Sequence, residues 1–237
     1  MLLSLYRHMS GHGRLCRRAW AKVGCSHRNG CSDRVLAALH VCFPGTRDAC
    51  GHVGTEEYVS KYLPAGHSAV GTCTGHEGIA AILKIAALGP EDTFCDLGSG
   101  CGQAVIHAHL ASPVRLSLGV ELSIERHLRA ETALQRMRLA GLGDVNRVVA
   151  FKHGDFLGLD LSAFTSIYVA SLAFRGRGLA QLAHKLQQEL PSRAAVFSLR
   201  QIPPSQSPTD APQRLRRLEL LDRHRIPCSW AEWADLW

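Results

Sequence analysis

From about residue 75, the chain alternates short apolar runs with longer amphipathic segments. The apolar runs predict buried strands at 93–96, 117–121, 148–151, 166–169 and 194–199. The amphipathic segments predict helices at 75–88, 103–111, 123–141 and 179–190. Because strands and helices alternate, we expect an α/β fold of the Rossmann-like class, a mostly parallel sheet with helices on both faces.

The third predicted helix has clear boundaries and a clear buried side. Ser123 stands where a helix N-cap is needed, and the helix runs to about Gly141. Its apolar positions predict the buried side, Ala130, Ala133, Leu134 and Met137. Its basic positions predict a solvated face, Arg126, Arg129, Arg136 and Arg138.

Residues 1–55 differ from the rest, because they are rich in Gly, His, Arg and Cys and show little periodicity beyond one or two helical turns at 35–41. We expect a basic arm there, followed by one domain at 56–237. Residues 1–32 hold six Arg or Lys and no acidic residue, out of a formal net charge of +7. Such a segment is typical of an organelle transit peptide, for a mitochondrion or plastid, or of an arm that binds nucleic acid or another polyanion. A leader without a role is the third alternative.

Metal and membrane binding are not predicted. Nine cysteines are many for an intracellular chain, and five of them precede residue 51, but no C-x-x-C pair occurs. Zinc sites favour paired ligands of that kind, so we expect no metal. No apolar run approaches the roughly 18 residues of a membrane span, so we expect no membrane partner.

One stretch, DLGSGCGQ at 96–103, combines three closely spaced glycines with the end of a predicted strand and the start of a helix. Gly98, Gly100 and Gly102 allow a tight turn and close backbone approach to a ligand. In a parallel sheet, ligands bind beyond the carboxyl ends of the strands, where this loop lies.

The spacing and the charge of the loop favour one class of ligand. The pattern is G-x-G-x-G, not the G-x-G-x-x-G of nicotinamide sites. Asp96 at the loop entrance would repel a pyrophosphate, and no P-loop lysine follows. S-adenosylmethionine carries an amine and a positive sulfonium and no phosphate, so an acidic neighbour suits it.

Two further strand ends support this cofactor. Glu121 lies 23 residues after Gly98, where an acid can accept both ribose hydroxyls. Asp155 can accept from an adenine amino group, and Phe156 can pack on the ring. The three strand-end signals together predict a class I methyltransferase. The expected cofactor-binding residues are Asp96, Gly98, Ser99, Gly100, Gly102, Gln103, Glu121, Asp155 and Phe156.

These residues resemble the disruptor-of-telomeric-silencing family of histone lysine methyltransferases. The resemblance covers roughly 56–202 and rests on FCDLGSGCGQ, GVELS, GDF, YVASLAF at 168–174 and GTCTGHEGIAAIL at 71–83. It implies that S-adenosylmethionine lies among Asp96, Gly98, Gly100, Gln103, Glu121, Asp155 and Phe156. It also implies a protein lysine as acceptor, a nuclear location and nucleosome contact through the basic arm.

Two departures from the family pattern bear on the acceptor. Val70-Gly71-Thr72 stands in place of Tyr-Gly-Glu, and Ala170-Ser171 in place of Asn-Asn. The family residues help to close the cofactor pocket and shape the lysine channel. A non-histone or small-molecule acceptor, and a non-catalytic cofactor-binding module, therefore stay open as alternatives. Ser171 is a candidate substrate-side contact, and the alternative is an ordinary strand-end serine.

Overall fold

The computed structural model describes residues 2–9, 30–45, 74–174, 176–203 and 217–228. Five parallel strands form the centre of the sheet in the order β4-β3-β2-β5-β6. They are β2 (Thr93–Leu97), β3 (Leu116–Glu121), β4 (Val148–His153), β5 (Ser166–Val169) and β6 (Ala195–Ser198). The order of the strands along the sheet changes its sense between β2 and β5, as in doubly wound folds, while the strands themselves stay parallel. The predicted strands, the parallel sheet and the Rossmann-like class are confirmed.

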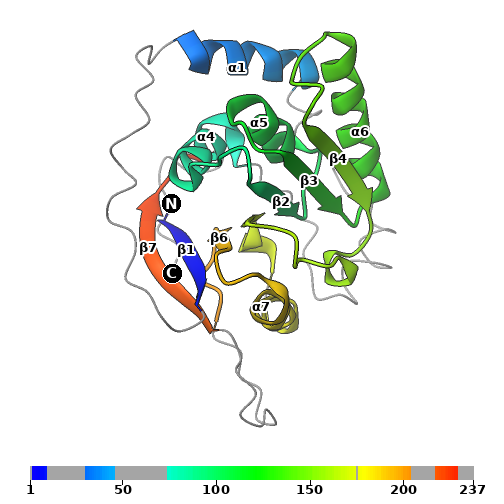
Figure 1. Cartoon of the computed structure of the whole chain (residues 1–237). Coiled ribbons are helices and arrows are strands. Elements are labelled where there is room, and N and C mark those ends of the chain that lie inside the picture. The colour runs from blue at the N-terminus through cyan, green and yellow to red at the C-terminus, as the bar shows by residue number, and fades with distance from the viewer. Residues whose placement is uncertain (1, 10–29, 46–73, 175, 204–216, 229–237) are drawn as a thin grey trace.

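Two antiparallel strands that the sequence did not predict extend the sheet. Strand β1 (Leu2–Met9) lies between β6 and β7 (Arg217–Arg225). Ser4 pairs with Ser198 on one side, and Leu2 pairs with Arg225 on the other. Figure 1 shows these two strands side by side at one edge of the molecule.

Helices cover both faces of the sheet. One face carries α4 (Gly75–Ala86), α5 (Gln103–Ala111) and α6 (Ile124–Leu139), and the other carries α7 (Arg177–Glu189) (Figure 1). Ser123 caps α6 as predicted, since its Oγ accepts the Arg126 N–H at 3.3 Å. The buried side of α6 is also confirmed, but Arg126 belongs to it rather than to the solvated face.

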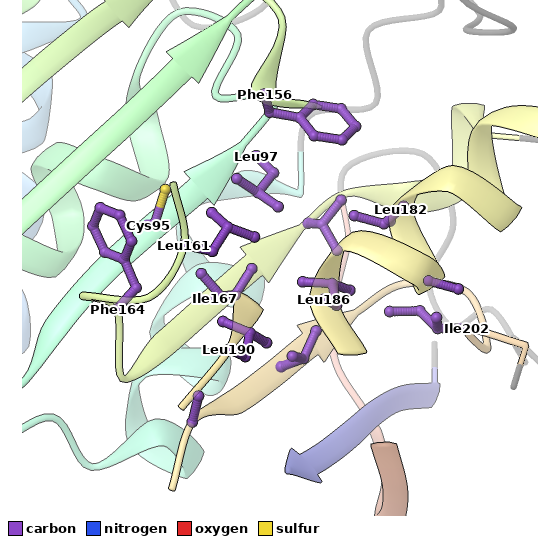
Figure 2. Close-up of a cluster of buried hydrophobic side chains, with 14 of the residues drawn as sticks. Cys95, Leu97, Phe156, Leu161, Phe164, Ile167, Leu182, Leu186, Leu190 and Ile202 are labelled. Carbon is purple, nitrogen blue, oxygen red and sulfur yellow. The ribbon is translucent and has the colours of Figure 1, made fainter. Parts of the chain in front are cut away.

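The core on the α7 side joins β2, β5 and β6 to that helix. Leu182 and Leu186 of α7 are 0% exposed and pack in one cluster with Leu97 and Ile167. Figure 2 shows these side chains together, with Phe156 at one end of the cluster. The cluster ends beneath the strand termini where the predicted cofactor residues lie, so its packing fixes their positions.

The opposite face includes a helix from the supposed arm. Helix α1 (Gly30–Cys42) lies over α5 and α6 (Figure 1). Leu39 and Phe43 are buried against Ile106 and Leu134. Since β1 also joins the sheet, the expectation that residues 1–55 lie outside the domain is corrected for these two segments. The basic residues at 14–28 lie outside the described residues, so their role stays a prediction.

In the described part of the chain, no helix is long and apolar enough to cross a membrane. The same residues contain no group of three or more His, Cys, Asp or Glu that could hold a metal ion.

Candidate active site

The glycine loop lies between β2 and α5, at the point where the sheet reverses its order. Gly98 and Ser99 donate their backbone N–H groups to the Val120 carbonyl at 2.9 and 3.0 Å, which ties the loop to β3. Gly98, Gly100 and Gly102 have φ angles of 86°, 55° and 87°. Other residues rarely adopt such angles, so the turn requires glycine.

The glycines serve two different purposes. A Cβ at Gly102 would lie 2.4 Å from Cζ of Phe151, and one at Gly119 in β3 would lie 2.6 Å from Oγ of Ser99. These two positions therefore allow the loop to pack on the protein itself. A Cβ at Gly100 would meet no atom of the described residues within 4 Å. Gly100 is thus the position where the loop backbone borders open space.

Glu121 connects the loop to the end of β3. Its Oε2 accepts the N–H of Gly100 at 2.8 Å, and its Oε1 accepts the N–H of Ser123 at 2.9 Å. The residue is only 4% exposed. Each carboxylate oxygen has a second lone pair, so the group can still accept hydroxyl donors such as those of a ribose.

Asp96 is a buried carboxyl group beside this loop. It is 3% exposed, and its Oδ1 has no hydrogen-bond partner among the described residues. Burial raises its pKa well above the usual range, and the nearby charge of Glu121 raises that pKa further. Oγ of Ser99 is also buried without a partner in the described structure. Buried polar groups normally have partners, so these atoms suit a ligand that carries hydrogen-bond donors and positive charge.

Asp155 and Phe156 follow β4, next to Glu121 in the sheet. Oδ1 of Asp155 accepts the N–H of Leu157 at 2.8 Å, and the residue is exposed. Phe156 is 5% exposed and stacks on Phe174, with ring centroids 5.6 Å apart. Both residues lie beyond the carboxyl end of β4, and their contacts with adenine stay a prediction. Gln103 begins α5 and is half-buried.

Ser171 lies at the end of β5, as expected, but its hydroxyl is turned inward. The residue is 0% exposed. Its Oγ lies 2.6 Å from Oγ of Ser198 and accepts the N–H of Arg200 at 2.9 Å. In this structure the hydroxyl supports the turn after β5, and its contact with an acceptor stays an untested prediction.

Two residues near the glycine loop were missed by sequence reasoning. Phe174 ends the YVASLAF segment, and its Cζ would lie 4.0 Å from a Cβ at Gly98. Arg200 follows β6, and its Nη1 donates to the Phe174 carbonyl at 3.2 Å. Their place after the carboxyl ends of β5 and β6 was the available signal.

A sequence model described as histone methylation protein DOT1 matches residues 55–230. The chain belongs to this family. The protein is therefore a methyltransferase that uses S-adenosylmethionine, as the loop chemistry predicted. The family match begins at the predicted domain boundary, so α1 and β1 are elements of this chain that lie outside the matched region. A search of curated proteins finds no match.

Several solved methyltransferases are similar in fold. An RNA methyltransferase from Salinibacter ruber with S-adenosyl-L-homocysteine is 22% identical, with a TM-score of 0.46, over 60% of this chain and 97% of its own. An S-adenosylmethionine-dependent methyltransferase from Thiobacillus denitrificans is 22% identical, with a TM-score of 0.42, over 52% and 48%. A geranyl diphosphate C-methyltransferase from Streptomyces coelicolor A3(2) is 22% identical, with a TM-score of 0.39, over 50% and 42%. The chain thus spans less than half of the last two.

The described residues fit S-adenosylmethionine. The open space at Gly100 admits a ligand against the loop, and the unpartnered carboxyl of Asp96 suits an ammonium group. Glu121 is held against the loop by the Gly100 N–H, and its contact with the ribose stays a prediction. When bound, the cofactor supplies a methyl group already activated by a positive sulfur. The protein has to bind, orient and exclude water, and such orientation provides a large part of the rate.

Proposed function

We propose that this methyltransferase modifies the side-chain amine of a lysine in a protein. The observation that carries the proposal is the length of the family match. It runs from residue 55 to residue 230 and so includes the segments after β5 and β6 as well as the cofactor loop. Members of the family are described as histone methylation proteins.

The chemistry of a lysine acceptor fits an apolar environment. A lysine amine has a pKa of about 10.4 in water and must lose a proton before its lone pair can attack. Desolvation favours the neutral amine, and Phe156 and Phe174 form an apolar pair after the carboxyl ends of β4 and β5. The nitrogen then forms a bond to the methyl carbon as the carbon–sulfur bond breaks. The product is a methylated ammonium that stays protonated at neutral pH, and the one proton released is the proton that the lysine lost before the attack.

The target protein is a separate question from the acceptor group. Ala170 and Ser171 replace the two asparagines expected from the family, and Ser171 points into the protein. This departure supports an acceptor site shaped differently from that of histone-modifying relatives. We therefore propose a protein lysine as the acceptor class and treat histones as one arm of the test.

The test uses the full-length protein with radiolabelled S-adenosylmethionine. Nucleosomes, free histones, a cellular protein extract and total RNA are offered separately, and labelled residues are identified by mass spectrometry. Methyl-lysine in any of the three protein arms supports the proposal. Label only in RNA overturns it, and cofactor binding without any transfer overturns it in favour of a binding module. Glu121→Ala serves as the control for cofactor dependence.

A further inference from the structure

The turn after β5 is held by the segment after β6. The Arg200 guanidinium donates from Nη1 to the Phe174 carbonyl at 3.2 Å. The Arg200 backbone N–H donates to Oγ of Ser171 at 2.9 Å. One residue therefore contacts both ends of the turn 171–174, although it lies 29 and 26 residues away in sequence.

The backbone of Arg200 also takes part in a closed ring of hydrogen bonds. Oγ of Ser198 donates its only proton to the Arg200 carbonyl at 2.8 Å. The 2.6 Å bond between the two serines must then be donated by Ser171. The Arg200 N–H returns to Ser171 and closes the ring. Both serines are 0% exposed, so the three bonds strengthen one another away from water.

The side chain of Arg200 has a separate role from this ring. The ring uses only the N–H and C=O of residue 200, which any residue except proline supplies. Among the described residues, the guanidinium donates to the carbonyl of Phe174. A purely structural residue at this position would not require arginine, so the charged side chain points to a function at Phe174.

Phe174 lies close to residues that follow two other strands of the sheet. Its ring stacks on Phe156 after β4, and the edge of that ring faces Gly98 after β2. The backbone of Phe174 belongs to the turn after β5, where Ala170 and Ser171 depart from the family pattern. Phe174 therefore lies both beside the cofactor loop and in the turn that we expect to face the acceptor.

We propose that Arg200 is a positioning residue for methyl transfer, which acts by holding Phe174 against Gly98 and Phe156. The guanidinium fixes the Phe174 carbonyl, the turn 171–174 keeps one conformation, and the ring keeps its place beside the loop. The inference rests on methyl transfer by this site and is independent of which acceptor is used.

The test compares Arg200→Ala and Arg200→Lys with Arg193→Ala, which removes an exposed arginine just before β6. We measure hydrogen exchange at the amides of 171–174, cofactor affinity by calorimetry, and kcat and KM for methylation. Arg200→Ala should accelerate exchange, weaken cofactor binding by about threefold to tenfold and lower kcat by about tenfold, as expected for one lost charge-assisted bond. Its Tm should stay close to that of Arg193→Ala, since the serine ring remains.

The conservative variant separates positioning from packing. Arg200→Lys keeps one charged donor, so it should recover part of kcat and of the exchange protection, whereas a lost packing contact would not be recovered. Equal exchange, affinity and kcat in Arg200→Ala and Arg193→Ala would overturn the proposal. So would a loss of kcat that merely follows a loss of Tm. If the wild-type protein transfers no methyl group to any lysine, exchange and cofactor affinity still decide the role of Arg200.

Discussion

Oε2 of Glu121 accepts the backbone N–H of Gly100 at 2.8 Å, which joins the end of β3 to the open corner of the loop after β2. The second carboxylate oxygen accepts the N–H of Ser123, the cap residue of α6. A single side chain thus fixes the loop, the strand end and the helix start. Support of the backbone is therefore one task of this carboxylate, and binding of a ribose is the second task that we predict for it.

Glu121→Ala should therefore lower both cofactor affinity and stability. The buried N–H of Ser123 and the part-buried N–H of Gly100 lose their acceptor, which costs about 1–3 kcal/mol of unfolding free energy for each group that stays unsatisfied. Loss of the ribose acceptor should weaken S-adenosylmethionine by about tenfold to a hundredfold. Calorimetry and thermal unfolding on the same sample measure the two effects.

Glu121→Gln is the matched control for the charge. Its amide oxygen can replace one acceptor, but its NH2 group then faces a backbone donor. The variant should lie between wild type and Glu121→Ala in both measurements. A lower Tm with unchanged affinity in both variants would remove Glu121 from the cofactor site.

The glycine loop offers a pair of substitutions with opposite expected effects. Gly100→Ala places its methyl group in open space, so beyond a strain of about 1–2 kcal/mol from its positive φ it should mainly obstruct the cofactor. Gly102→Ala carries the same backbone strain and also overlaps Phe151. We expect Gly102→Ala to have the lower Tm. Relative to its loss of Tm, Gly100→Ala should lose more cofactor affinity. Equal behaviour in both measurements would refute the division of roles.

Cofactor binding should strengthen with pH because of Asp96. Burial raises the pKa of this carboxyl group, so the free protein keeps its proton there to a higher pH than an exposed aspartate does. Its raised pKa also means that stability falls as pH rises through the titration, since the folded state binds the proton more tightly. A bound ammonium favours the ionised form, and each released proton changes Kd by up to about tenfold per pH unit. Calorimetry in buffers of different ionisation enthalpy counts the protons.

The matched variant for this prediction is Asp96→Asn, which cannot ionise. Proton release on cofactor binding should fall by the share that belongs to Asp96. An identical proton count in Asp96→Asn and wild type would mean that Asp96 does not face the ammonium group.

Acid should destabilise the protein through two histidines of α5. Burial lowers the pKa of His107 and of His109 from 6.5 to about 4; His76 lowers the first further and Arg147 the second. Between about pH 6.5 and 4 the unfolded state binds more protons, so unfolding free energy falls as pH falls. The slope is up to about 1.4 kcal/mol per pH unit for each histidine.

Thermal unfolding between pH 7 and pH 5 measures this slope. The double variant His107→Gln/His109→Gln removes both titrating groups, and its glutamine oxygen can still accept the N–H of Asp144 that His109 accepts at 3.3 Å. An unchanged pH slope in the double variant would assign acid sensitivity to other groups.

The place of α1 in the domain can be tested within one helix. Leu39 is 4% exposed and packs against α5 and α6, whereas Val41 is 46% exposed. Leu39→Ala should cost about 2–5 kcal/mol of unfolding free energy, and Val41→Ala should cost little. Denaturant unfolding distinguishes the two, and equal small effects would restore the view of 1–55 as an independent arm.

The parallel part of the sheet could be predicted because β2, β3, β5 and β6 are mostly buried and therefore read as apolar runs. Strands β1 and β7 could not, since LLSLYRHM and RLELLDRHR carry charges and their pairing depends on residues far along the chain. Arg126 was misplaced for a related reason. Its long apolar stem can be buried while periodicity counts only its charge.

The candidate site shows the same division. Asp96, Glu121 and Asp155 could be placed together because the carboxyl ends of parallel strands meet at one edge of the sheet. The contacts across that edge could not be foreseen. Bonds such as that between Ser171 and Ser198, and the stacking of Phe156 on Phe174, depend on strand register and side-chain direction in three dimensions.

The position of β1 has a consequence for the order of folding. Its partners in β6 and β7 lie near the other end of the chain, with Leu5 opposite Phe197 and Met9 opposite Arg217. During synthesis residues 2–9 emerge well before residues 195–225 and remain without their strand partners until those residues have been made. Contacts of such long sequence separation slow folding and leave strand edges exposed to other chains. The sheet is therefore completed late, by pairing of its first strand with its last two.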